Sequence, residues 1–163
     1  MSELKRITTE YIDMEDRMRL TGETEDGNAI VLWLTAKLLQ RLLPHLFKWL
    51  EQQADKAMPA TIVQSFAQQA AKAGMAPEPP VKQQEDTPSW LVHAVDVNHE
   101  KGFLQLTFRA PGQEQQRLQL PTQQLRQWLS ITQMQWLRAG WPKDLWPDWM
   151  EAGEPGKAQL ALH

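Results

Sequence analysis

The feature that most constrains the fold of this chain is a pattern of apolar residues that occurs twice. A shift of 86 residues brings four pairs into alignment: Met18 with Leu104, Leu20 with Leu106, Leu32 with Leu118, and Leu34 with Leu120. After one inserted residue the match continues at a shift of 87, with Leu38, Leu42, Trp49 and Leu50 aligned with Leu125, Leu129, Trp136 and Leu137. Self-similarity of this kind predicts two copies of one structural unit.

Each copy is expected to consist of three strands followed by a helix. Apolar and polar residues alternate around Leu20 and Leu106, as in half-buried strands, and later recur three to four residues apart, as on a helix. Residues directly opposite in a hairpin share a face, so Leu20 is expected opposite Leu32 and Leu106 opposite Leu118. The first hairpin then has a three-residue loop that ends at Gly27, where a left-handed residue is needed. The predicted fold class is α+β, a tandem repeat of two βββα units, each an antiparallel three-stranded meander plus a helix.

The repeat and the prolines divide the chain into four segments. They are a first βββα unit (1–57), a short helix with a Pro/Gln-rich linker (58–88), a second βββα unit with a Trp-rich C-terminal segment (89–150), and a mobile tail (151–163). The apolar residues of the short helix fall on roughly one face: Ile62, Phe66, Ala70 and Ala73. The linker Met75–Pro88 is expected to be too polar and proline-rich to pack. Trp90–Val97 is expected to form a single strand.

Composition excludes several classes of function. The chain has no cysteine, which rules out disulfides, thiol catalysis and Cys-based metal sites. Its formal charge of −3 supplies no excess of cations for binding nucleic acid. The N-terminal segment lacks the apolar core of a signal peptide, and Lys37, Arg41 and Lys48 interrupt the longest apolar runs. No membrane span, no cofactor and a cytoplasmic location are therefore expected.

Two groups of polar residues are weak candidates for chemistry. Asp13, Glu15 and Asp16 form an acidic cluster that could hold magnesium or act as acid and base, although such a run is usually a solvated turn. His93 and His99 would need to converge with a carboxylate to bind a metal, and a metal site is not expected. No phosphate-binding loop or nucleophile motif is present. An enzyme is therefore the third-ranked class.

Tryptophan is the most specific compositional feature, because five of the eight residues fall between Trp128 and Trp149. The last of them form a segment that either completes the core or anchors a partner, through Trp141, Leu145, Trp146, Trp149 and Met150. Strands that are apolar on both faces also suggest contact with a second copy of the chain. We therefore expect a non-enzymatic protein-interaction, assembly or accessory protein, whose partner is another protein or a second copy of itself.

Single-stranded nucleic-acid binding is the alternative function. The strands carry arginines and tryptophans that could form a modest basic face with stacking platforms: Arg17, Arg19, Trp33, Trp90, Arg109 and Arg117. In its layout of tandem sheet-then-helix units the chain resembles the Whirly and PUR-type single-strand binders, which have four strands per unit. Three strands per unit and a negative net charge depart from that pattern.

Overall fold

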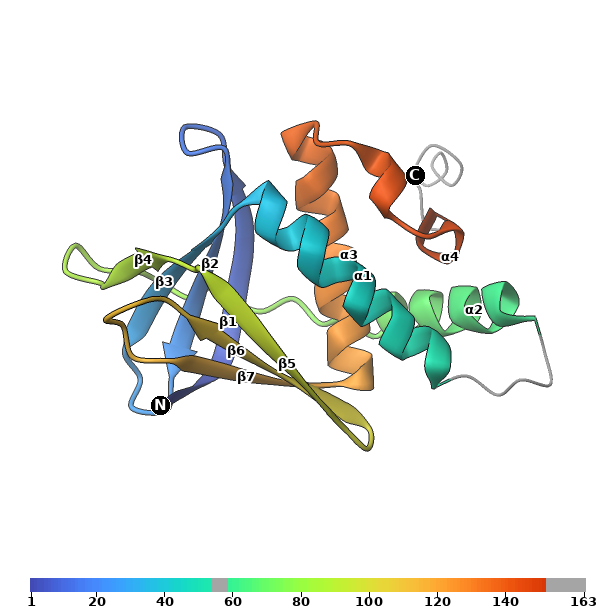
Figure 1. The fold of residues 1–163 in the computed structure, drawn as a ribbon, viewed down its shortest axis with the longest axis horizontal. Helices are drawn as coiled ribbons and strands as arrows, with labels where there is room; N and C mark the ends of the chain where they lie inside the picture. Colours follow the sequence, from blue (N-terminus) through green and yellow to red (C-terminus); the bar gives the residue numbers. More distant parts are fainter. Residues whose placement is uncertain (54–58, 152–163) are drawn as a thin grey trace.

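The computed structural model describes residues 1–53 and 59–151, and within them the chain is an α+β protein (Figure 1). The strands are β1 (Ser2–Ile12), β2 (Arg17–Thr24), β3 (Ala29–Leu34), β4 (Ser89–Leu91), β5 (Ala94–Glu100), β6 (Phe103–Arg109) and β7 (Gln116–Pro121). The helices are α1 (Ala36–Gln52), α2 (Ala60–Ala73), α3 (Thr122–Ala139) and α4 (Asp148–Glu151), with a 3-10 turn at Lys143–Leu145. The tail predicted from residue 151 lies, beyond its first residue, outside the described part.

All seven strands belong to one mixed sheet in the order β4-β3-β2-β1-β7-β6-β5. The hairpin neighbours are antiparallel, whereas β1 pairs with β7 and β3 pairs with β4 in parallel. β4 and β5 are separated by only two residues in the chain but stand at opposite ends of this order, so the sheet curls back on itself. The strands of the two halves thus meet edge to edge.

The strand predicted over Trp90–Val97 is broken into β4 and β5, which corrects the sequence-based expectation. The break occurs where the chain changes its hydrogen-bonding neighbour. The amide of Val92 donates to the carbonyl oxygen of Trp33 on β3, and the amide of His93 donates to that of Arg109 on β6. The backbone of the segment predicted as one strand therefore hydrogen-bonds to two different neighbours, β3 and β6.

The predicted hairpin registers are confirmed. Leu20 lies opposite Leu32 in the β2–β3 pair, and Leu106 lies opposite Leu118 in the β6–β7 pair. All four side chains are buried, as expected for residues that share the core face of a sheet. Gly27 has a φ of 86°, the left-handed conformation that the three-residue loop requires.

The core lies between the curled sheet and the helices α1 and α3. The N-cap of α1 is Thr35, whose hydroxyl oxygen accepts a hydrogen bond from the Leu38 amide at 3.1 Å. α1 then buries a wide apolar stripe that includes Leu39, Leu43, Leu46 and Leu50, each completely covered. Burying a leucine of this kind contributes about 2 kcal/mol, so the stripe holds the helix on the core.

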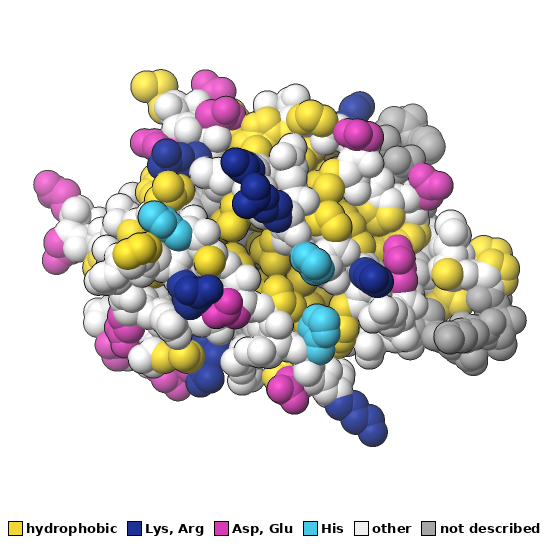
Figure 2. Space-filling view, viewed as in Figure 1, with side chains coloured by type: hydrophobic (Ala, Val, Ile, Leu, Met, Phe, Trp, Pro, Cys, Tyr) yellow, Lys and Arg dark blue, Asp and Glu magenta, His cyan; other side chains and the backbone are white. Residues whose placement is uncertain are grey.

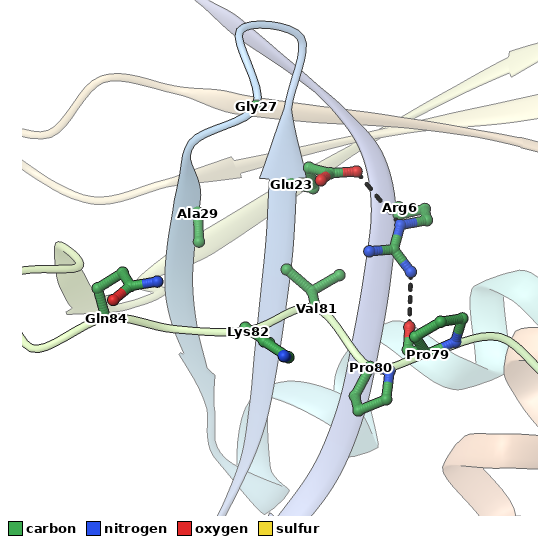
Figure 3. A pocket seen from close by; sticks show the side chains of 9 residues that line it. All are labelled: Arg6, Glu23, Gly27, Ala29, Pro79, Pro80, Val81, Lys82 and Gln84. Atoms are coloured by element: carbon green, nitrogen blue, oxygen red, sulfur yellow. Dashed lines mark hydrogen bonds and ion pairs between the residues drawn. The ribbon is translucent and has the colours of Figure 1, made fainter.

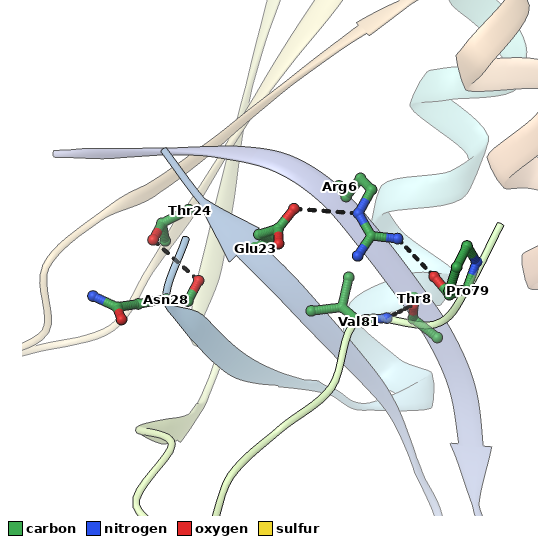
Figure 4. A network of polar contacts seen from close by, with 7 residues as sticks. All are labelled: Arg6, Thr8, Glu23, Thr24, Asn28, Pro79 and Val81. Atoms are coloured by element: carbon green, nitrogen blue, oxygen red, sulfur yellow. Dashed lines mark hydrogen bonds and ion pairs between the residues drawn. The ribbon is translucent and has the colours of Figure 1, made fainter. Parts of the chain in front are cut away.

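The proline-rich segment after α2 packs against the sheet, contrary to the expectation that it would not. It crosses the outer faces of β1, β2 and β3 (Figure 3). A guanidinium nitrogen of Arg6 donates to the carbonyl oxygen of Pro79 at 2.6 Å, and the amide of Val81 donates to the Thr8 hydroxyl at 2.9 Å (Figure 4). Side chains of β1 thus hold the backbone of this segment at Pro79 and Val81, and Val81 is buried. A hollow of about 330 Å³ lies between the segment and these strands.

Candidate interaction surface

The Trp-rich segment lies over the ends of α1 and α3. Trp146 and Trp149 are each 4% exposed, and both contact the ring of Phe47 on α1, at centroid distances of 5.3 and 6.0 Å. Met150 is buried as well, whereas Trp141 and Leu145 are partly buried. This burial favours the core-completing interpretation of the segment, and contact of these five residues with a partner stays a prediction.

The arginines proposed for a nucleic-acid face are each paired with a carboxylate. The pairs are Arg17 with Glu15 at 3.8 Å, Arg19 with Glu10 at 2.9 Å, Arg109 with Asp96 at 2.7 Å, and Arg117 with Glu3. Of the two tryptophans proposed as stacking platforms, Trp90 is buried and Trp33 is half-buried. The strand faces therefore carry little unneutralised positive charge, and nucleic-acid binding through them stays a prediction.

The acidic cluster is engaged in contacts within the chain. Asp16 accepts hydrogen bonds from the Tyr11 hydroxyl at 2.7 Å and from the Trp141 indole at 3.1 Å, while Glu15 pairs with Arg17. The hydrogen bond from Tyr11 lowers the pKa of the Asp16 carboxyl, and the same bond raises the pKa of Tyr11 to about 12. In the described part of the chain, no three His, Asp or Glu residues converge to hold a metal ion. No described helix is long and apolar enough to span a membrane.

Helix α2 is oriented with its polar side inward. It buries Gln64, Gln68 and Ala71, and Gln64 is only 1% exposed. On the opposite side Ile62 is 43% and Phe66 is 68% exposed. A surface helix normally turns its apolar side to the core. The reversed orientation of α2 therefore exposes its apolar side chains to solvent.

A hydrogen-bonded network holds α2 in this orientation. The Gln64 side-chain amide donates to the carbonyl oxygen of Leu50 at 2.9 Å, which links α2 to the end of α1. The Gln68 amide donates to the carbonyl oxygen of Arg126 at 2.7 Å and to the Ser130 hydroxyl at 2.8 Å, which links α2 to α3. Because buried polar groups are costly unless they are paired, these contacts fix which side of α2 faces inward.

Arg126 is the centre of this network. It is 6% exposed, and its guanidinium donates to the side-chain oxygens of Gln64 at 2.6 Å and Gln68 at 3.3 Å. The guanidinium also lies 5.7 Å from the centre of the Trp149 ring, within reach of a cation–π interaction. Burial lowers the pKa of Arg126 to about 10. The charge is therefore accommodated by amide oxygens and an aromatic ring.

The solvent-facing side of α2 carries an apolar row, which we call the α2 stripe: Ile62, Phe66, Ala70 and Ala73. Apolar side chains are visible at the end of the molecule where α2 lies (Figure 2). Helical spacing in the sequence places these four residues on one face but does not determine which way that face points. Gln64 and Gln68, four residues apart on the other side, were the overlooked signal, because both can reach partners on one neighbouring helix.

A second cleft, of about 950 Å³, lies where β1 and β7 separate. These strands pair at only two positions, Ser2 with Gln116 and Glu3 with Arg117. Past that point residues 5–9 and 118–121 line opposite walls, and the start of α3 and residues 74–80 complete the lining. Glu78 is the one carboxylate among these lining residues. The cleft therefore offers no pair of carboxylates for acid–base chemistry.

Comparison of the chain with protein-family models, with curated proteins and with solved structures gave no significant match.

Proposed function

We propose that this chain is a non-enzymatic assembly protein that associates with a second copy of itself through the α2 stripe. The observation that carries the proposal is the reversed orientation of α2, which buries Gln64 and exposes Phe66. An apolar row that the fold turns to water is stabilised when another surface covers it. The proposed location is the cytoplasm.

The order of side chains along the stripe favours a second copy as the occupant. The large residues, Ile62 and Phe66, stand in the first half of the helix, and the small ones, Ala70 and Ala73, stand in the second. Two such helices that run antiparallel about a two-fold axis would place each large side chain over a small one of the partner. A two-fold interface requires this self-complementarity.

The size of the stripe sets the expected affinity. A helix of 14 residues is about 21 Å long. One face of such a helix buries less area than the roughly 800 Å² per partner of a standard interface. The dimer is therefore expected to be reversible, with a Kd of about 10 to 100 µM.

Sedimentation equilibrium over a range of concentrations tests this proposal. The wild-type chain of 18.8 kDa should approach twice that mass at high concentration. Phe66→Glu should weaken the association at least about 10-fold, because a central aromatic contact is lost in both copies. Met134→Glu is the matched control, since Met134 is also an exposed apolar residue, 54% exposed on α3, and it should leave the dimer unchanged. A wild-type chain that stays monomeric throughout, or an equal effect of the two variants, would rule the proposal out.

We also propose that the fold is a tandem repeat of two βββα units. Two observations support this proposal. Residues 86 positions apart take part in equivalent hairpin pairs, such as Leu20 with Leu32 and Leu106 with Leu118. The first strand segment of each half also pairs in parallel with the last strand of the other half, β1 with β7 and β4 with β3.

A further inference from the structure

The exposed side of α1 carries a row of basic and polar side chains. We call Lys37, Arg41 and Lys48 the α1 cations, and the exposed His45 lies in the same row. The spacings of four, four and three residues place these side chains on one face of the helix. That face is opposite the stripe through which α1 packs on the core.

This arrangement is unfavourable for an isolated helix. Lys37 lies in the first turn of α1, where the helix dipole favours negative charge, and no acidic residue is present in that turn. Lys37 and Arg41 are four residues apart, a spacing at which like charges repel. The positive charges along this face therefore destabilise the helix slightly.

The α1 cations also differ from the strand arginines in their partners. Arg17, Arg19, Arg109 and Arg117 all pair with carboxylates. Within the described residues no carboxylate pairs with any of the three α1 cations. The positive charge of this face is therefore available to a ligand from outside.

An apolar hollow lies on the same face of the molecule. Figure 2 shows it beside dark-blue and cyan side chains, in the region where α1 and β5 cross the front of Figure 1. The partly buried apolar residues of these two elements include Leu38 on α1 and Val95 and Val97 on β5, which pack against the core. Near the C-terminal ends of α1 and β5, the rings of Trp49 and His99 lie 6.4 Å apart and connect the two elements. β5 is also the last strand in the sheet order, so one of its edges has no neighbour among the described strands.

From these observations we infer that the face formed by α1 and β5 binds an extended acidic segment of a partner protein. Carboxylates of the segment would pair with the α1 cations, and its apolar side chains would enter the hollow. The free edge of β5 can supply backbone hydrogen bonds to an extended chain. Single-stranded nucleic acid fits less well, because it is held by stacking on exposed rings and Trp49 on α1 is 4% exposed.

A fluorescent peptide of five Glu-Val repeats is a suitable probe, and its binding to the full chain can be followed by anisotropy at low ionic strength. Charge-driven binding should weaken as salt is added. The variant Lys37→Gln/Arg41→Gln/Lys48→Gln should bind at least about 10-fold more weakly. The matched control Lys5→Gln/Lys82→Gln/Lys143→Gln removes the same charge at exposed lysines outside α1 and β5 and should keep the wild-type affinity.

Two further measurements separate this inference from its alternatives. A Lys-Val peptide of the same length should not bind, and a ten-nucleotide oligo(dT) should bind more weakly than the Glu-Val peptide. No binding of the acidic peptide at low salt, an equal loss in the control variant, or tighter binding of oligo(dT) would overturn the inference. Sedimentation of the α1 variant should still show the wild-type dimer, so failure here is distinguishable from failure of the α2 proposal.

Discussion

At the scale of single residues, Asp16 connects two distant parts of the chain. It lies in the loop between β1 and β2 with a φ of 53°, a left-handed conformation that Asp and Asn adopt more readily than other non-glycine residues. Its carboxylate accepts hydrogen bonds from Tyr11 and from Trp141, which is 125 residues away. One short side chain therefore holds the Trp-rich segment against the first hairpin.

This contact predicts a specific pH dependence. Because the pKa of Asp16 is lowered in the folded chain, the stabilisation is present above the ordinary carboxyl pKa and is lost as pH falls through the lower folded value. Asp16→Asn keeps the backbone conformation and one acceptor oxygen but removes the charge. Its Tm should lie below that of the wild type near neutral pH, and the difference should vanish in acid.

Thermal unfolding at a series of pH values checks this expectation. Asp26→Asn in the next loop is a control for the contact with the Trp-rich segment. Among the residues that the structure describes, the Asp26 carboxylate accepts hydrogen bonds only within its own loop, from Thr24 and Asn28, whereas the Asp16 carboxylate also binds Trp141. The tryptophan fluorescence of the chain, to which Trp141 contributes, should change in the Asp16 variant and not in the Asp26 variant. A Tm difference for Asp16→Asn that stays constant down to acid pH would contradict the assigned role of the charge.

At the scale of elements, α2 shows where local sequence reasoning ends. Helical spacing identified the apolar face of α2 correctly. Its direction is decided by Arg126, which is 62 residues away from Gln64 in sequence and binds the opposite face of the helix. Periodicity within one segment contains no information about such a partner.

The importance of Arg126 for α2 can be measured. Arg126→Met fills similar space but leaves the side-chain oxygens of Gln64 and Gln68 without their donor. Each unpaired buried acceptor is costly, so the free energy of unfolding should fall by about 2 to 4 kcal/mol. Arg138→Met, on the exposed end of the same helix, should change it by less than about 0.5 kcal/mol. Urea denaturation gives both values, and an equal effect of the two substitutions would refute the assigned role.

The same distinction applies to the strands: their hairpin pairing could be predicted from the sequence, and the break between β4 and β5 could not. The hairpin pairs of Leu20 and Leu106 followed from alternation and loop length, because both determinants are local. The break between β4 and β5 did not, because the carbonyl groups that bind the two residues at the break belong to Trp33 on β3 and Arg109 on β6, which are far apart in the sheet order. The packing of the segment around Val81 was missed for a similar reason, since its partner Thr8 lies on β1.

At the scale of the whole molecule, two exposed faces have different chemistry. The α2 stripe is apolar and suits a second copy of the chain, whereas the α1 cations suit an acidic partner. The net charge of −3 hides this difference, because the strand arginines are neutralised by carboxylates and the α1 cations are not. Composition alone therefore indicates the Trp-rich segment, which the fold largely buries, and does not indicate the exposed faces of α1 and α2.

The measurement that tests the central claim most directly is disulfide cross-linking between copies. The natural chain has no cysteine, so Ile62→Cys and Ala73→Cys each introduce a single thiol. Antiparallel association through the α2 stripe places residue 62 of one copy beside residue 73 of the other. An equimolar mixture under mild oxidation should therefore form the mixed 62–73 disulfide faster than either like pair. Predominant 62–62 and 73–73 products, or no more dimer than an exposed Lys82→Cys variant forms, would contradict the account.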